Sequence, residues 1–164
     1  MGRYGGYDQF DIKFVHDTIN FIVNFDPSFV FLFVNTRKFI EHPNVIFLDP
    51  IITKQEKTDF ILACDAMIHA RSDGESFGLS ICEFLNCNKP VISFGQGRDK
   101  NNVELLSQYN LIYNNQYELL CNIFKLKYGL LRGDYSQITN SFSPENVMKK
   151  FQEVFLNDWI SNIY

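Results

Sequence analysis

The sequence predicts a Rossmann-like α/β fold, in which a parallel sheet carries helices on both faces. Short continuous apolar runs, typical of strands buried on both faces, recur along the chain. Segments whose apolar residues have helical spacing separate these runs. With 164 residues, 46% of them hydrophobic and 21% charged, the composition is that of an ordinary globular protein. We therefore expect residues 1–164 to form a single domain.

The first expected elements are a helix and two strands. Residues 11–25 place apolar side chains at helical spacing. Apolar strands follow over residues 29–34 and 45–48, joined by a short polar or helical stretch over residues 36–41. The chain itself shows a turn and a helix before these strands, so the first strand of the sheet is expected upstream of Met1.

The following elements alternate in the same way. A helix is expected over residues 53–64, where Thr53 caps the N-terminus and Glu56 completes a capping box. The others are strands over residues 66–70, 90–94 and 111–113, and helices over residues 77–87, 103–109 and 116–128.

The last expected helix begins at Ser143-Pro144-Glu145, which combines an N-cap residue with proline at the first helical position. Its apolar side chains share one face and comprise Val147, Phe151, Val154 and Phe155, with Trp159 continuing the stripe.

Composition excludes several classes of function. A net charge of −4 argues against a nucleic-acid partner, although a few local donors can still hold a small anion. The apolar runs are far shorter than the roughly 20 residues that cross a bilayer, and the opening residues lack the apolar region of a signal peptide. We expect a cytoplasmic protein with no transmembrane segment.

Cysteine and histidine residues give no sign of a metal site. Four cysteines form no CxxC pair and have no nearby histidine ladder, so reduced thiols are expected: Cys64, Cys82, Cys87 and Cys121. His69 lies on a predicted strand among apolar residues, which favours a partly buried, hydrogen-bonded histidine over a ligand. The sequence has no Gly-Lys-Ser/Thr, and Gly95-Gln96-Gly97 is too short for a dinucleotide fingerprint.

The candidate chemistry lies between residues 71 and 83. Ligands of parallel sheets bind at the carboxyl ends of strands, where helix N-termini present free N–H groups. Gly78 allows close approach to the backbone, and the N–H groups of Gly78, Leu79 and Ser80 would face a phosphate.

Two glutamates flank this position in the sequence. Glu75 precedes the helix and Glu83 lies about one turn inside it. Ionised carboxylates bind sugar and ribose hydroxyls well, because each oxygen accepts from adjacent O–H donors. However, glutamates are common near helix N-termini for electrostatic reasons alone, so the pair by itself does not establish a site.

The context of the pair carries a resemblance to a known family. The run from Asp65 to Phe84, followed by Lys89-Pro90-Val91-Ile92, resembles the signature of glycosyltransferase family 4. That signature has two glutamates separated by seven residues, Phe-Gly-Leu between them and a Pro-Val strand after them. Residues 44–48 and the opening Gly2-Arg3 extend the resemblance. It implies the C-terminal, nucleotide-sugar-binding half of a retaining GT-B glycosyltransferase, with the acceptor-binding domain absent.

The resemblance also implies roles for single residues. Glu75 would contact hydroxyls of the transferred sugar, and Arg3 would neutralise the leaving diphosphate, which makes these two the candidate catalytic residues. The donor-binding residues would be Phe77, Gly78, Leu79, Ser80 and Glu83. Among them, Glu83 would bind the ribose diol, and the N–H groups of residues 78–80 would hold the diphosphate.

The implied substrate is a UDP- or GDP-linked sugar, whose hexosyl group is transferred to a hydroxyl without a cofactor or a metal. The acceptor lobe would come from elsewhere or from a partner chain. One departure from the family is Asp8, which stands where a phosphate-binding lysine is usual, so a register shift or another cation is required. Two alternatives stay open: a non-catalytic nucleotide-sugar-binding module, and an inactive fragment that acts as an interaction subunit.

Overall fold

The computed structural model describes residues 1–131 and 133–156. Its main sheet has six strands, namely β1 (Gly2–Tyr4), β2 (Phe31–Val34), β3 (Val45–Leu48), β4 (Met67–His69), β6 (Val91–Phe94) and β8 (Ile112–Tyr113). They lie in the order β3-β2-β1-β4-β6-β8, and the recorded pairings are all parallel. This is the order of a doubly wound Rossmann sheet, so the predicted fold class is confirmed.

The first strand is β1, which lies between β2 and β4 near the centre of the sheet. The expectation of a first strand upstream of Met1 was therefore wrong. Glycine and arginine give β1 no apolar run, which is why the sequence pattern hides it. Arg3 can occupy a buried strand because its guanidinium donates to Thr36 Oγ1 and to the carbonyls of Asn35 and Gly6.

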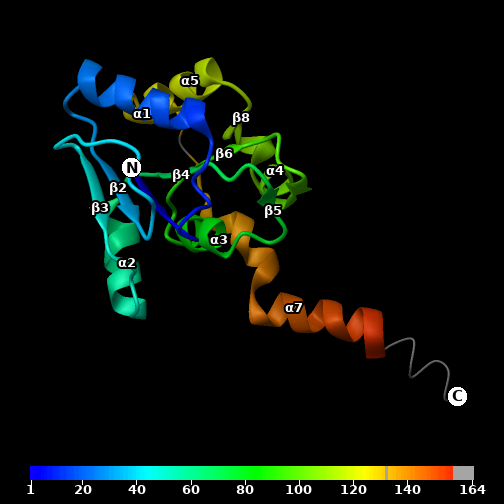
Figure 1. Cartoon of the computed structure of the whole chain (residues 1–164). Helices are drawn as coiled ribbons and strands as arrows, with labels where there is room; N and C mark the ends of the chain where they lie inside the picture. The colour runs from blue at the N-terminus through cyan, green and yellow to red at the C-terminus, as the bar shows by residue number, and fades with distance from the viewer. Residues whose placement is uncertain (132, 157–164) are drawn as a thin grey trace, which may run out of the picture.

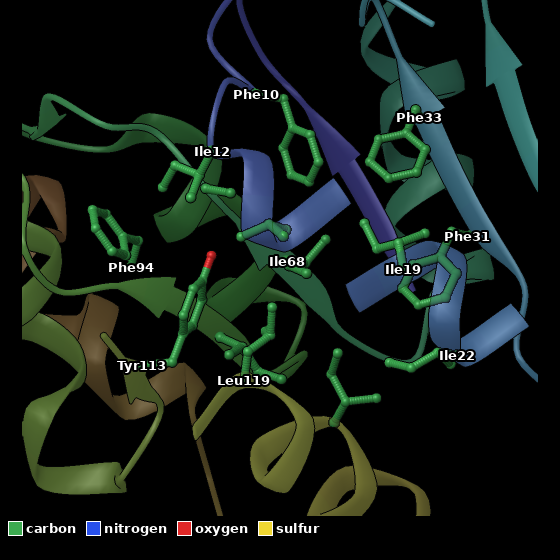
Figure 2. Packing of buried hydrophobic residues seen from close by; sticks show 14 of the residues in the cluster. Phe10, Ile12, Ile19, Ile22, Phe31, Phe33, Ile68, Phe94, Tyr113 and Leu119 are labelled. Atoms are coloured by element: carbon green, nitrogen blue, oxygen red, sulfur yellow. The ribbon is translucent and has the colours of Figure 1, made fainter. Parts of the chain in front are cut away.

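Helices cover both faces of the sheet (Figure 1). On one face, α1 (Lys13–Phe25) and α5 (Gln116–Lys127) pack over a core that includes Ile19, Phe31 and Leu119. Figure 2 shows the side chains of this core converging between the helices and the strands. On the other face, α2 (Lys54–Ala63) and α3 (Leu79–Asn86) pack over a second core that includes Phe84 and Met67. Two cores of this kind explain why strands such as β2 and β3 consist of continuous apolar runs.

The predicted helix caps are confirmed at two positions. The Thr53 side chain accepts from the Glu56 amide and the Glu56 carboxylate accepts from the Thr53 amide, which starts α2 with a complete capping box. The Ser143 side chain caps α7 (Pro144–Phe151), and proline occupies the first turn. In Figure 1 this helix points away from the sheet. The predicted apolar side chains of this helix and of residues 152–156 after it are exposed over about half of their surface (Val147 and Phe151, then Val154 and Phe155); Trp159 lies outside the described residues.

Several short elements were not predicted. Two two-residue strands, β5 (Gly74–Glu75) and β7 (Asp99–Lys100), form a separate parallel ribbon. Helix α6 (Ser136–Thr139), which precedes α7, was not predicted either, whereas α4 (Asn101–Leu106) corresponds to the helix expected over residues 103–109 and begins directly after β7. Residues 36–41, expected to be polar or helical, contain no helix. Within residues 1–131 and 133–156, no helix combines the length and the hydropathy needed to cross a membrane.

Candidate functional site

The candidate site lies where the strand order reverses. The chain leaves β1 towards β2 on one side and resumes at β4 on the other, so the carboxyl ends of β1 and β4 border the crevice that binds ligands in such sheets. The segments that follow the two strands meet there. Ser72, after β4, donates through its hydroxyl and its amide to the Asp11 carboxylate, after β1, at 2.5 and 3.1 Å.

Helix α3 presents an open N-terminus at this edge. Gly78 is its N-cap with φ of 80°, a conformation that glycine adopts without strain, and no side chain caps the helix. The first amides of a helix have no partner within the helix, so the N–H groups of residues 78–80 are available to a ligand. Leu79 is 70% exposed, and the Phe77 ring packs edge-on against Phe142 at 5.3 Å between centroids. The structure thus brings all the predicted donor-binding residues of this segment to one place.

Glu75 lies on β5, just before α3, with only 15% of its side chain exposed. Its carboxylate accepts from His69 Nε2 at 3.1 Å and from Arg71 Nη1 at 3.4 Å. The hydrogen bond from His69, more than the charge of Arg71, lowers the pKa of Glu75, while partial burial opposes that shift. Glu75 is therefore an ionised acceptor at neutral pH.

Behind Glu75 lies a buried polar chain that the sequence did not indicate. His69 Nδ1 lies 2.8 Å from Ser93 Oγ, and the Asn102 amide donates to the same Ser93 Oγ at 2.8 Å. His69, Ser93 and Asn102 are 5%, 0% and 1% exposed. The prediction of a hydrogen-bonded histidine is confirmed, with nearly complete burial. The partners of His69 on β5 and β6, and Asn102 on α4 behind Ser93, were missed because only the fold brings these elements together.

Glu83 lies on the opposite side of the α3 N-terminus, facing α2. Its carboxylate pairs with Lys57 at 2.5 Å, and each side chain is about one third exposed. Partial burial raises the pKa of the Glu83 carboxyl. The two glutamates therefore flank the helix N-terminus, with partners from α2 for Glu83 and from β4 for Glu75.

A pocket of about 230 Å³ opens beside this ion pair, at the carboxyl ends of β1, β2 and β3. Its walls include Tyr4, Asn35, Ile51 and Lys57. The Lys57 ammonium lies 5.7 Å from the centroid of the Tyr4 ring and so links the pocket to Glu83. A larger cavity of about 750 Å³, beside Met1, lies at the amino ends of the strands, away from the glutamates.

Arg3 is buried beneath the loop that follows β1 and is 4% exposed. Its guanidinium donates to Thr36 Oγ1 at 2.5 Å and to the Gly6 carbonyl at 2.9 Å. Burial lowers the pKa of Arg3 to about 10, and the carboxylates of Asp11 and Glu75 oppose that shift, so Arg3 stays charged at neutral pH. Arg3 thus brings positive charge under the crevice, in a position more enclosed than the opening loop that the resemblance implies.

Asp8 does not face the crevice as an uncompensated negative charge. Its carboxylate pairs with Arg37 at 2.8 Å, and both side chains are largely exposed. The Arg37 amide also donates to the Tyr7 carbonyl, which fixes this pair at the edge of the loop. The position holds no lysine, so any cation for a diphosphate must come from elsewhere.

Comparisons with known proteins give a structural likeness only. No protein-family model matches the chain, and no curated protein does. HepE of Anabaena in complex with UDP-glucose superposes with a TM-score of 0.65 at 15% identity, covering 88% of this chain and 43% of HepE. The HepE complex with UDP gives a TM-score of 0.67 at 16% identity, covering 98% of this chain and 48% of HepE. The chain therefore spans less than half the length of these proteins and shares the fold of that part.

Proposed function

We propose that this chain binds a nucleotide-diphosphate sugar and forms the donor-binding half of a retaining GT-B glycosyltransferase. The observation that carries the proposal is the placement of Glu75 and Glu83 on two sides of the open α3 N-terminus, at the reversal of strand order. The likeness to HepE chains that hold UDP-glucose and UDP supports it. The resemblance to glycosyltransferase family 4 around Glu75 and Glu83 supplies the reaction class.

The geometry suggests how such a donor would lie. The diphosphate would bind the N–H groups of residues 78–80, where the helix dipole favours negative charge. Glu83 would accept from the ribose hydroxyls, and the base would enter the pocket lined by Tyr4 and Ile51, which shares Lys57 with Glu83. The sugar would extend towards Glu75. A UDP- or GDP-linked hexose fits this order of contacts.

In the proposed reaction, the bond from the anomeric carbon to the diphosphate breaks while a bond to an acceptor hydroxyl forms on the same face. In the proposed step, the acceptor proton passes to the departing donor phosphate. The residues of this chain would act electrostatically, because in this arrangement Arg3 and the α3 N-terminus would lie near the charge that develops on the departing diphosphate. The proposal involves no metal and no cofactor.

The test is a thermal-shift screen of the purified chain against UDP, GDP, ADP and their sugars. A ligand at 100 times its Kd stabilises a fold by about 2.7 kcal/mol, which for a domain of this size raises Tm by roughly 5–10 °C. We expect this rise with either UDP or GDP and a comparable or larger one with the matching sugar nucleotide. If no nucleotide shifts Tm, the proposal is wrong.

An interaction subunit is the second candidate. It is favoured by the half-exposed apolar side chains of α7, such as Val147 and Phe151. An interaction subunit predicts no nucleotide response in the same screen, so the two candidates are separated by one measurement.

A further inference from the structure

We propose that Asn102, Ser93 and His69 form a buried hydrogen-bonded chain that holds the Glu75 carboxylate in place as an acceptor for donor-sugar hydroxyls. His69 would then be a positioning residue, acting on the sugar through Glu75. The identity of the ligand rests on the proposed function, whereas the effect of the hydrogen-bonded residues on Glu75 does not.

With a neutral His69, the hydrogens of these side chains can be placed in one consistent way. The Asn102 amide nitrogen uses its two hydrogens on Ser93 Oγ and the Phe94 carbonyl, both at 2.8 Å. Ser93 Oγ accepts from Asn102, so its own hydrogen is free to donate to His69 Nδ1 at 2.8 Å. A neutral His69 then carries its proton on Nε2 and donates it to Glu75 at 3.1 Å. The opposite tautomer would aim two donors at Ser93 Oγ and leave the Glu75 contact without a hydrogen.

The chain is anchored in four elements. Asn102 lies on α4, Ser93 on β6, His69 on β4 and Glu75 on β5. The Tyr113 hydroxyl of β8 donates to the His69 carbonyl at 2.9 Å, which fixes the backbone at the same point. Because the first three residues are almost fully buried, water cannot replace a lost partner, and each bond is costly to break. Glu75 alone of the four reaches the edge of the crevice.

The other charged groups near Glu75 do not duplicate this contact. Arg71, in the loop after β4, donates to the Glu75 carboxylate at 3.4 Å. Arg3 on β1 interacts with Glu75 through its charge and not through a hydrogen bond among the described residues. Asp11 faces Arg3 from the segment before α1 and holds Ser72. The hydrogen bond from His69 is the largest influence that lowers the pKa of Glu75. Removing the hydrogen bond from His69 should therefore raise the pKa of Glu75 even though Arg71 and Arg3 remain.

The test compares His69→Phe, which keeps an aromatic ring but removes the donor, with His69→Gln, whose amide can still donate to Glu75. His42→Phe is the matched control, since His42 lies in the loop before β3 and contacts the Asn44 amide instead. The first readout is the pKa of the Glu75 carboxyl in the ligand-free chain, followed by carbon-13 NMR. We expect it to rise in His69→Phe, because the hydrogen bond that favours the ionised carboxylate is lost, and to stay near the wild-type value in His69→Gln and His42→Phe.

The second readout is the affinity for UDP-glucose relative to UDP at pH 5 and pH 8. Wild type should show the same preference at both, because Glu75 is ionised throughout. In His69→Phe the preference should fall at pH 5, where part of the Glu75 population gains a proton, and recover at least in part at pH 8, where Glu75 is ionised again. Affinity for UDP itself should not change.

The outcomes separate the two proposals. An unchanged Glu75 pKa in His69→Phe, with UDP and UDP-glucose weakened equally, means that His69 only supports the fold and overturns the inference. A raised Glu75 pKa in His69→Phe, in a protein whose wild type does not prefer UDP-glucose over UDP, supports the hydrogen-bonded chain behind Glu75. It contradicts the placement of the sugar beside Glu75. If His69→Phe does not fold, Ser93→Ala removes one hydroxyl and should shift the pKa of Glu75 in the same direction. A wild-type pKa in Ser93→Ala would overturn the part of the chain beyond His69.

Discussion

Glu83 illustrates how a single residue couples stability to binding at this site. Its carboxylate already has a partner in Lys57 at 2.5 Å, so a ribose diol must share or displace that ammonium. A carboxylate of this kind binds two adjacent hydroxyls more strongly than a neutral amide does.

We predict that Glu83→Gln weakens binding of the preferred nucleotide diphosphate by roughly 1–3 kcal/mol, because the amide keeps the size but loses charge-assisted acceptance. Isothermal titration calorimetry measures the change. Glu145→Gln on α7 is the control, since it removes one exposed carboxylate away from α3 and should leave the affinity unchanged. Equal affinities for wild type and Glu83→Gln would remove Glu83 from the binding site.

At the residue scale, the sequence predicts which residues belong to the candidate site better than it predicts their hydrogen-bond and ion-pair partners. Spacing and the family resemblance bring Glu75, Gly78 and Glu83 to one helix start, and the structure places them together. Spacing cannot show that His69 meets Ser93 or that Glu83 meets Lys57, because those contacts join elements 24 and 26 residues apart in the chain. Arg3 shows the same limit, since the fold buries it.

At the scale of elements, the two-residue ribbon of β5 and β7 holds Glu75 at the edge of the crevice. Gly74 enters the ribbon with φ of 79°, and a Cβ atom at this position would lie 2.0 Å from the Asp99 carbonyl oxygen. A side chain there is therefore strained twice, by the backbone conformation and by the contact with β7.

We predict that Gly74→Ala lowers the free energy of unfolding by about 1–3 kcal/mol and weakens sugar-nucleotide binding, because the ribbon must shift to admit the methyl group. Urea denaturation and calorimetry measure the two effects. Gly133→Ala is the matched control, since a Cβ there meets its nearest atom at 3.6 Å, an ordinary contact. Wild-type stability in Gly74→Ala would show that the ribbon does not hold Glu75 in place.

Some helices and strands are easier to predict from the sequence than others, for physical reasons. Strands with long apolar runs, such as β2 and β6, were predicted because burial on both faces demands such residues. The capping box of α2 was predicted because it is local in sequence. By contrast, β1 consists of Gly-Arg-Tyr, and β5 and β7 have two residues each, so their strand character depends on neighbours rather than on their own side chains.

At the scale of the whole molecule, the sheet presents one wall of the proposed ligand site. The glutamates, the α3 N-terminus and the pocket beside Lys57 all lie at the carboxyl edge of the strands. HepE, with the same fold over part of its length, is more than twice as long as the matched region. In a two-lobed transferase the acceptor lies in the cleft between the lobes, so the second wall matters for catalysis more than for donor binding.

We predict that the 164-residue chain by itself binds its donor but transfers sugar slowly, with hydrolysis of the donor as its main turnover. Positioning two reactants supplies roughly 7–11 kcal/mol of barrier reduction, and one wall of a cleft forfeits most of it. The measurement is product formation from several sugar nucleotides with simple hydroxyl acceptors, with Glu75→Gln as the control for donor-dependent background. Addition of an acceptor lobe that docks on the chain should raise transfer but not hydrolysis. Turnover of about 1 per second or more without such a lobe, a rate within the ordinary enzymatic range, would show that the residues of this chain already complete the active site.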